Sequence, residues 1–213
     1  MSRRRSWVLA PAFSAIALAA LGLSAYAGAS SRQGFAPVQP VDFPHPVHVQ
    51  ELGLNCLYCH YAANKSPDPG LPAVGTCMGC HNVIGPQRPA RDTLPARTSQ
   101  GITQLHSFAP PMQPAQWKPI PWVRIHKLPE YVHFPHMRHV NAGVTCQTCH
   151  GPVQEMSRVY QYASLNMGWC VNCHVQGYDL AEGLRMAGDT AGARAAADAE
   201  PRRARYDCSV CHF

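Results

Sequence analysis

Hydrophobic residues are distributed unevenly along this chain of 213 residues. One long apolar run, the 20 residues from Trp7 to Tyr26, follows three consecutive arginines and contains no charged residue. A helix of this length spans about 30 Å, which is the thickness of the apolar part of a bilayer. The pattern predicts a retained transmembrane helix, with residues 1–27 forming a cytoplasmic N-terminus and a membrane anchor.

The same run could instead belong to a signal peptide that is removed, because Ala25-Tyr26-Ala27 resembles a cleavage site. The run is longer than the apolar region of about 7–15 residues that is typical of signal peptides, which favours retention. In both cases the arginines keep the N-terminus in the cytoplasm and the following chain is exported. We expect a single-pass protein of the inner (cytoplasmic) membrane whose larger part lies on the periplasmic side.

Large aliphatic residues are sparse beyond the N-terminal run. The chain contains 20 Pro and 16 Gly, and only 14% of its residues are charged. A chain with this composition has difficulty building an ordinary hydrophobic core from its own side chains. We expect a mostly irregular fold with short α-helices, organised around a bound apolar group.

The motif C-x-x-C-H occurs five times and uses all ten cysteines. Each copy is typical of covalent attachment of a c-type haem, in which two thiols bond the porphyrin and the following His binds the iron. The predicted attachment residues are Cys56, Cys59, Cys77, Cys80, Cys146, Cys149, Cys170, Cys173, Cys208 and Cys211. The predicted proximal iron ligands are His60, His81, His150, His174 and His212. Five haems c would provide the apolar core that the side chains lack.

Paired cysteines also form zinc sites, redox dithiols and disulfide frameworks. A zinc site does not require His after every second Cys, and no cysteine is left over for structural pairing. The formal net charge is +6, but the propionates of five haems would make it negative. Because the sequence also lacks a basic stripe interleaved with aromatic residues, it does not indicate a nucleic-acid partner.

The sequence F-P-H-x-x-H appears twice, at Phe43–His48 and at Phe134–His139. Each copy is followed by a Gly three residues before one C-x-x-C-H motif, and by a second such motif about twenty residues later. This self-similarity indicates duplication of a two-haem unit. The expected segments are a tether at 28–42, a first two-haem unit at 43–85, a Pro-rich strap at 86–125, a second two-haem unit at 126–178, and an Ala-rich segment with the fifth haem site at 179–213.

Two of these segments carry further expectations. Proline is too frequent in the strap for a long helix or a central strand, so we expect an irregular segment that crosses haem faces or a partner. The stretch Asp179–Asp198 is rich in Ala and predicts an exposed helix that ends before Pro201.

Seven histidines remain after the five proximal ones, and each iron needs at most one distal ligand. His45 and His48 lie three residues apart, as do His136 and His139, so each pair shares one face of a helical turn. Two such side chains cannot bind one iron from opposite sides, and each pair should therefore bind two haems. We assign the first His of each pair to the haem at the first motif of its own unit, and the second His to a neighbouring haem.

The fifth distal ligand is open. His126 is the first choice, and Met156 or Met167 could take its place, which would raise the reduction potential of that haem. His106 and His133 are weaker candidates.

Six-coordinate irons leave no open position for a substrate, which favours electron transfer over catalysis on iron. The sequence contains no G-x-S-x-G, phosphate-binding glycine loop or H-E-x-x-H motif. We therefore expect an electron-transfer subunit without substrate chemistry of its own. Two alternatives stay open: a self-contained, membrane-anchored quinol dehydrogenase, and a multihaem enzyme that reduces a nitrogen or sulfur oxide on a five-coordinate haem.

The paired F-P-H-x-x-H and C-x-x-C-H units resemble class III multihaem cytochromes. The fuller pattern is similar to the pentahaem cytochrome c subunit of alternative complex III, a bacterial quinol-oxidising membrane complex. That pattern includes the N-terminal anchor, the five motifs, the stretch HKLPEYV at 126–132 and Asn166-Met167-Gly168-Trp169 before Cys170. The resemblance covers nearly the whole chain and is weak in the strap and the Ala-rich tail.

The resemblance implies a subunit of a hetero-oligomeric membrane complex that relays electrons from quinol oxidation, in a respiratory or photosynthetic chain, to a periplasmic acceptor. The implied partners are an iron–sulfur subunit related to molybdopterin oxidoreductases, polytopic quinol-binding membrane subunits and monohaem cytochrome c subunits. A soluble cytochrome c or a cupredoxin would be the eventual acceptor.

Overall fold

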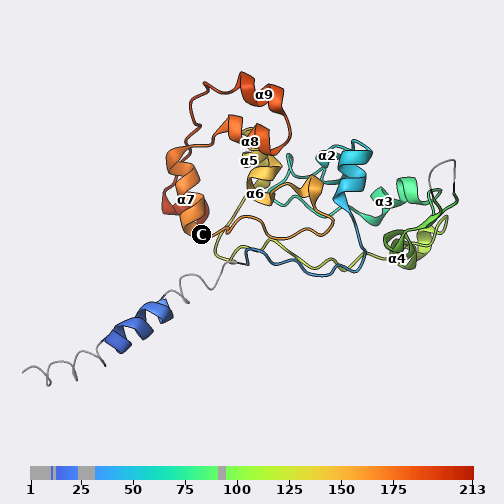
Figure 1. The fold of residues 1–213 in the computed structure, drawn as a ribbon, viewed down its shortest axis with the longest axis horizontal. Helices are drawn as coiled ribbons and strands as arrows, with labels where there is room; N and C mark the ends of the chain where they lie inside the picture. Colours follow the sequence, from blue (N-terminus) through green and yellow to red (C-terminus); the bar gives the residue numbers. More distant parts are fainter. Residues whose placement is uncertain (1–10, 12, 24–31, 91–94) are drawn as a thin grey trace, which may run out of the picture.

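Short helices joined by long irregular segments make up most of the folded chain (Figure 1). The computed structural model describes residues 11, 13–23, 32–90 and 95–213. The labelled helical segments are η1 (Val47–Glu51), α2 (Cys56–Cys59), α3 (Val74–His81), α4 (Gln100–Phe108), η2 (Pro114–Gln116), α5 (His136–Asn141), α6 (Cys146–His150), η3 (Val153–Glu155), α7 (Met167–Gln176), α8 (Leu180–Met186), α9 (Thr190–Ala195) and α10 (Cys208–Cys211). The predicted class, an irregular chain with short helices, is confirmed for these residues.

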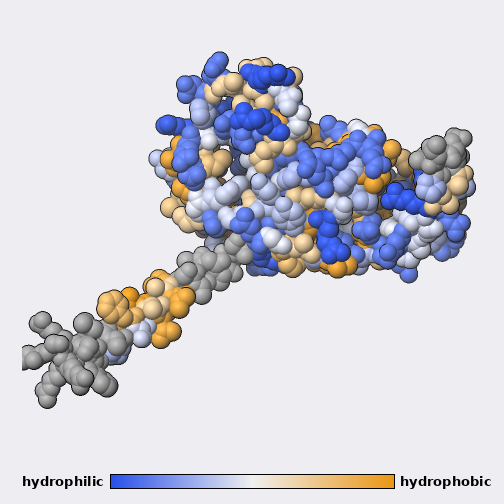
Figure 2. All heavy atoms as spheres, viewed as in Figure 1, coloured by the Kyte–Doolittle hydropathy of each residue, from blue (hydrophilic) through white to orange (hydrophobic). Residues whose placement is uncertain are grey.

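The predicted membrane anchor at 1–27 falls largely outside the described residues. Its described part, residues 13–23, is helical and exposes large apolar side chains such as Phe13, Leu18 and Leu23. These side chains make this segment apolar in Figure 2, whereas the folded body shows a mixed surface. Within the part of the chain that the structure describes, no helix has the length and apolar character needed to cross a membrane.

The described part of the tether, residues 32–42, lies along two later segments of the chain. The Gln39 side chain donates to the Val123 carbonyl and accepts from the Val123 amide, both at 2.9 Å. The Gly34 amide donates to the Gln161 carbonyl at 2.7 Å, and the Gln161 amide donates to the Phe35 carbonyl at 3.1 Å. These bonds hold the chain that follows the N-terminal segment against the folded body.

The Pro-rich strap packs over one end of the first unit. Val41, Met78, Leu105, Ala109 and Ile120 form a buried cluster, and Met78 is fully buried. The strap also contains α4, because its prolines leave residues 96–109 free and the Ser99 hydroxyl accepts from the Ile102 amide at 3.3 Å. Strands β1 (Gln87–Arg88) and β2 (Arg97–Thr98) form a short antiparallel pair.

The Ala-rich segment differs from the single exposed helix that the sequence predicted. It forms two helices, α8 and α9, which pack against each other. Gly188 adopts a φ of +85°, and the Asp189 carboxylate accepts from the Gly192 amide at 2.8 Å. A left-handed glycine followed by an N-cap ends one helix and begins the next. Ala181 and Ala193 are buried, so the pair is only partly exposed.

Candidate haem-binding sites

Each C-x-x-C-H motif lies in or at the end of a short helix: α2, α3, α6, α7 or α10. In a helix, two residues three positions apart share one face, so both thiols of a motif can reach one porphyrin edge. All ten cysteines are free, and none is used in a disulfide.

Side-chain capping marks where two of these helices, α2 and α7, begin. The Asn55 side chain accepts from the Leu57 amide at 2.9 Å before α2, and the Asn166 side chain accepts from the Trp169 amide at 2.8 Å before α7. The repeated glycines, Gly53 and Gly143, have φ angles of +68° and +87°. Only Gly adopts this left-handed turn readily, which explains why both units carry it just before a motif.

The structure brings proximal and predicted distal histidines together in three pairs. The ring centroids are 6.3 Å apart for His48 and His81, 6.4 Å for His136 and His150, and 6.1 Å for His139 and His174. Two imidazoles that bind one metal ion from opposite sides, each through a bond of about 2 Å, hold their centroids about 6 Å apart. The three pairs therefore fit one haem iron each.

In most of these histidines, and in His212, a hydrogen bond to one ring nitrogen leaves the other ring nitrogen available to a metal. In six histidines Nδ1 lies 2.5–3.3 Å from a backbone carbonyl oxygen; they are His48, His81, His136, His139, His174 and His212. A carbonyl oxygen only accepts, so Nδ1 carries the proton and Nε2 keeps its lone pair. Histidines that bind metals commonly have this arrangement.

The repeated Phe supports the second distal His in each unit. Phe43 stacks on His48 with a centroid distance of 4.3 Å, and Phe134 stacks on His139 at 4.2 Å. The same rings contact the first His of each pair edge to face, at 4.9 Å in both units. One aromatic side chain thus restricts the orientation of two imidazoles.

Burial keeps the central imidazoles neutral and able to bind a metal. Burial, together with the charges of His126, His136 and His60, lowers the pKa of His150 to about 3. Burial, with the charges of His60 and His48, lowers the pKa of His45 to about 4. His45 thus lies near His60, as its assignment to the haem at Cys56 requires. Its Nδ1 is buried and has no hydrogen-bond partner among the described residues.

The candidates for the fifth distal position lie in different places. The His126 ring contacts the His150 ring edge to face at 4.4 Å, and its buried Nε2 has no hydrogen-bond partner in the described part of the chain. His133 lies beside the last motif, because its amide donates to the Cys211 carbonyl at 3.0 Å. Nε2 of His106 donates to the His81 carbonyl at 2.9 Å, which gives this ring a structural role.

The two methionine candidates also differ. Met156 is buried, and Met167 is 68% exposed at the start of α7. His126 as fifth ligand stays a prediction.

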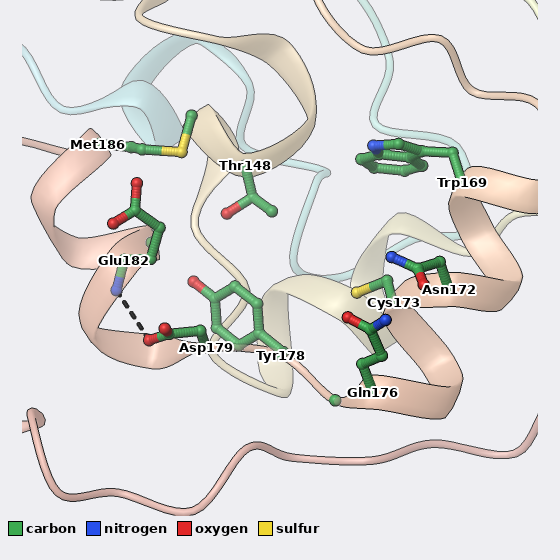
Figure 3. A pocket seen from close by; sticks show the side chains of 11 residues that line it. Thr148, Trp169, Asn172, Cys173, Gln176, Tyr178, Asp179, Glu182 and Met186 are labelled. Atoms are coloured by element: carbon green, nitrogen blue, oxygen red, sulfur yellow. Dashed lines mark hydrogen bonds between the residues drawn. The ribbon is translucent and has the colours of Figure 1, made fainter.

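A cavity of about 240 Å³ lies beside the fourth motif (Figure 3). Thr148 of α6, Trp169 and Cys173 of α7, and Met186 of α8 contribute to its lining. Figure 3 shows the Cys173 side chain between Trp169 on one side and Tyr178 on the other. A thiol at the wall of a partly apolar cavity is suited to a covalently attached porphyrin.

Proximal and distal histidines face each other in pairs, and His126 also contacts the ring of His150. In the ranges that the structure covers, no three or more His, Cys, Asp or Glu side chains converge to hold a metal ion. A zinc site draws three or four ligands from the protein, whereas a haem iron needs only two because the porphyrin supplies four. The paired arrangement is the one that haem requires.

Several positioning groups could not be found from the sequence. The carbonyls of Pro67, Arg205 and Tyr131 accept from Nδ1 of His136, His174 and His212. Every residue carries a backbone carbonyl, so no residue type marks these positions in advance.

Comparisons with known proteins agree with this chemistry. The family described as cytochrome c3 matches residues 138–213. The multiheme cytochrome c subunit of menaquinone reductase from Nitratidesulfovibrio vulgaris is 24% identical over 157 residues, which cover 64% of this chain and 67% of that protein. These similarities imply c-type haem, while the number five stays a prediction. The chain thus carries a cytochrome c3-like multihaem domain, acts in multihaem cytochrome c electron transfer, and is distantly related to the cytochrome subunit of a quinone reductase.

Proposed function

We propose that the chain is the electron-relay subunit of a quinol-oxidising membrane complex of the alternative complex III type. Its five motifs would hold five haems c, and bound haem iron would supply one-electron redox chemistry. The chain itself supplies thioether attachment, axial imidazoles and the spacing between sites. It would lie between an iron–sulfur subunit and a monohaem or soluble acceptor on the periplasmic side of the inner membrane.

The observation that carries this proposal is the set of three pairs of facing histidines, whose ring centroids lie 6.1–6.4 Å apart. A metal held between two imidazoles has no free position for a substrate. Such a site can exchange electrons but cannot activate a bound molecule. The apolar helical residues 13–23, which follow the arginines, support attachment to a membrane or to a membrane subunit.

A second candidate has the opposite direction of electron flow. The relative in Nitratidesulfovibrio vulgaris is named as a subunit of a menaquinone reductase, so its complex delivers electrons to a quinone. The same chain of axial histidines would serve either direction, because the potentials of the partners decide the net flow.

The test is to purify the chain with its native partners from membranes and to measure quinol oxidation with cytochrome c as acceptor. We expect several subunits to copurify and the haems to become reduced when quinol is added. Reduction of added quinone by a periplasmic donor, without quinol oxidation, would favour the second candidate.

The control is the purified single chain with all its haems. We expect it to accept electrons from a chemical reductant but not to oxidise quinol. Quinol oxidation by the isolated chain would contradict the relay proposal and favour a self-contained quinol dehydrogenase. A substrate-sensitive high-spin signal in electron paramagnetic resonance would favour an enzyme.

A further inference from the structure

We infer that the five attachment motifs form one unbranched row, in the spatial order Cys77, Cys56, Cys146, Cys170, Cys208. The motifs that begin at Cys77 and Cys208 are the two ends of this row. This inference rests on the proposed relay function and specifies its path. The order differs from the order along the chain, because the first two motifs are exchanged.

The junction between the two units lies at the centre of the row. The Cys56 and Cys146 thiols lie close together, and their interaction lowers the pKa of Cys56 and raises that of Cys146, so the first motif of one unit meets the first motif of the other. The loop that follows α2 docks on α5: the His136 amide donates to the Pro67 carbonyl at 3.1 Å, and the Asn141 side chain donates to the Asn64 carbonyl at 3.1 Å.

One end of the row is the motif in α3. Cys59 of the Cys56 motif lies near the Cys77 motif, because the charge of Cys80 helps to raise the pKa of Cys59 and the charge of Cys59 helps to raise the pKa of Cys77. His48, which precedes the Cys56 motif, pairs with His81. In Figure 1, α3 and α4 lie at one end of the long axis of the folded body, with α2 nearer the middle. The motif at Cys77 is therefore terminal and is connected to the rest through the Cys56 motif.

The other end is the motif in α10. His136 and His139 of α5 pair with His150 and His174, so the motifs at Cys146 and Cys170 are neighbours. The charge of Cys211 contributes to the raised pKa of Cys170, which places the last motif near the fourth. The tail that leads to α10 is bonded to the end of α7, since the Ala204 amide donates to the His174 carbonyl at 3.2 Å. Figure 1 places the C-terminus beside α7, at the end of the folded body opposite α3.

Two consequences follow from a single row. A partner that gives or takes electrons at α3 would meet the strap, and one at α10 would meet the C-terminal residues, where Phe213 is 92% exposed. Any electron that moves from one end of the row to the other must also pass between the haems at Cys56 and Cys146. Pro67 is therefore a positioning residue for this crossing, because its carbonyl holds His136 from the other unit.

The test uses the full chain with every haem attached, in detergent and without partners. Nuclear magnetic resonance follows the haem methyl signals during stepwise oxidation and gives the redox interaction of each haem pair. Oxidation of one haem raises the potential of another through their charges, and this effect falls with distance. Nuclear Overhauser contacts to Met78 and to Trp169 would identify the haems at Cys77 and Cys170 without any substitution.

We expect the four largest redox interactions to occur between haems that are neighbours in the proposed row. The smallest should occur between the haems at Cys77 and Cys208. An interaction between those two haems as large as that between the haems at Cys56 and Cys146 would overturn the row. The variant His48→Met gives a second check, because the haem that it shifts should be terminal. Because this measurement needs no partner, it tests the row separately from the activity of the complex: haems that follow the row, together with a purified complex that does not oxidise quinol, would reject only the proposed function.

Discussion

The two repeat units hold their second distal histidine in the same way. In both, the Phe of F-P-H-x-x-H stacks on that imidazole at 4.2–4.3 Å. In both, its Nδ1 donates to the carbonyl of the Pro next to that Phe, at 3.1 Å for His48 and 3.2 Å for His139. Six residues of sequence therefore contain everything needed to orient this ring.

The units differ at the first histidine of the motif. Nδ1 of His136 lies 3.3 Å from the Pro67 carbonyl, which belongs to the other unit. The equivalent Nδ1 of His45 is buried and finds no partner among the residues described. The second unit thus uses the first as a support, and the relation is not mutual. The two units therefore share the local geometry of the motif and differ in its long-range contacts.

The second motif of each unit is also supported differently. In the first unit, Met78 of α3 is buried in the aliphatic cluster beneath the strap. In the second, α7 is bonded to the tail at 202–205, because the Ala204 amide donates to the His174 carbonyl at 3.2 Å. Apolar burial stabilises one end of the molecule, and backbone hydrogen bonds stabilise the other.

The largest effect should come from removing the second histidine of F-P-H-x-x-H, which both units hold in the same way. His48→Ala and His139→Ala should each leave one iron with a single axial ligand. Each should convert about a fifth of the low-spin haem signal to high spin, because one haem of five is affected. Electron paramagnetic resonance of the oxidised protein measures this.

The matched control for this pair is His106→Ala, which removes a ring whose Nε2 donates to the His81 carbonyl. We expect its haems to stay low-spin. A high-spin signal in His106→Ala, or none in His48→Ala, would contradict the ligand assignment.

The difference in support predicts unequal costs of side-chain truncation at equivalent motif positions. Met78→Ala empties a fully buried site and should lower the free energy of unfolding by about 2–5 kcal/mol. Val171→Ala, at the same position of the fourth motif, is only half-buried and should cost about 1 kcal/mol. Guanidinium unfolding followed by circular dichroism compares the two. Equal costs would mean that the cluster beneath the strap does not stabilise that end.

Local features of the fold could be predicted from the sequence, and long-range ones could not. The two F-P-H-x-x-H copies predicted that each histidine pair serves two haems, and the structure places His136 near His150 and His139 near His174. The three-residue spacing of the two histidines is sufficient for that inference, because a helical turn fixes the direction of both side chains. Pro67 and His136 lie 69 positions apart in the sequence, and no residue pattern in either segment indicates that they are in contact.

The sequence did contain signals for two features that differ from our expectations: the division of the Ala-rich segment into two helices, and the helix within the Pro-rich strap. Gly188 followed by Asp189 has the pattern of a helix end and a new N-cap, which separates α8 from α9. Ser99 and the absence of Pro from 96 to 109 permit α4 within the strap. In both places the average composition of a long segment concealed a short, well-capped helix.

The aromatic stacking should contribute equally in the two units. Phe43→Leu and Phe134→Leu keep an apolar side chain but remove the stacked ring, and each should lower the free energy of unfolding by about 0.5–1.5 kcal/mol. The g-values of one haem should also shift, because its distal imidazole is then less restricted. Val83→Ala, at a site that is 84% exposed, should change neither quantity. A shift in only one unit would show that the repeat is not equivalent at this position.

The last effect concerns the glycine before the first motif of each unit. Gly53→Ala and Gly143→Ala place a Cβ on residues with φ of +68° and +87°, which should cost about 1–2 kcal/mol each. An added Cβ at Gly53 meets no described atom within 4 Å, whereas at Gly143 it lies 3.3 Å from the Arg202 guanidinium. The cost at Gly53 is therefore purely conformational, and Gly143 should cost the same or slightly more. Gly85→Ala is the matched control, because Gly85 has equally open surroundings in the described structure and no positive φ, so its stability should not fall. If Gly53→Ala proved as neutral as Gly85→Ala in the same unfolding assay, the left-handed turn would not be what both units retain this residue for.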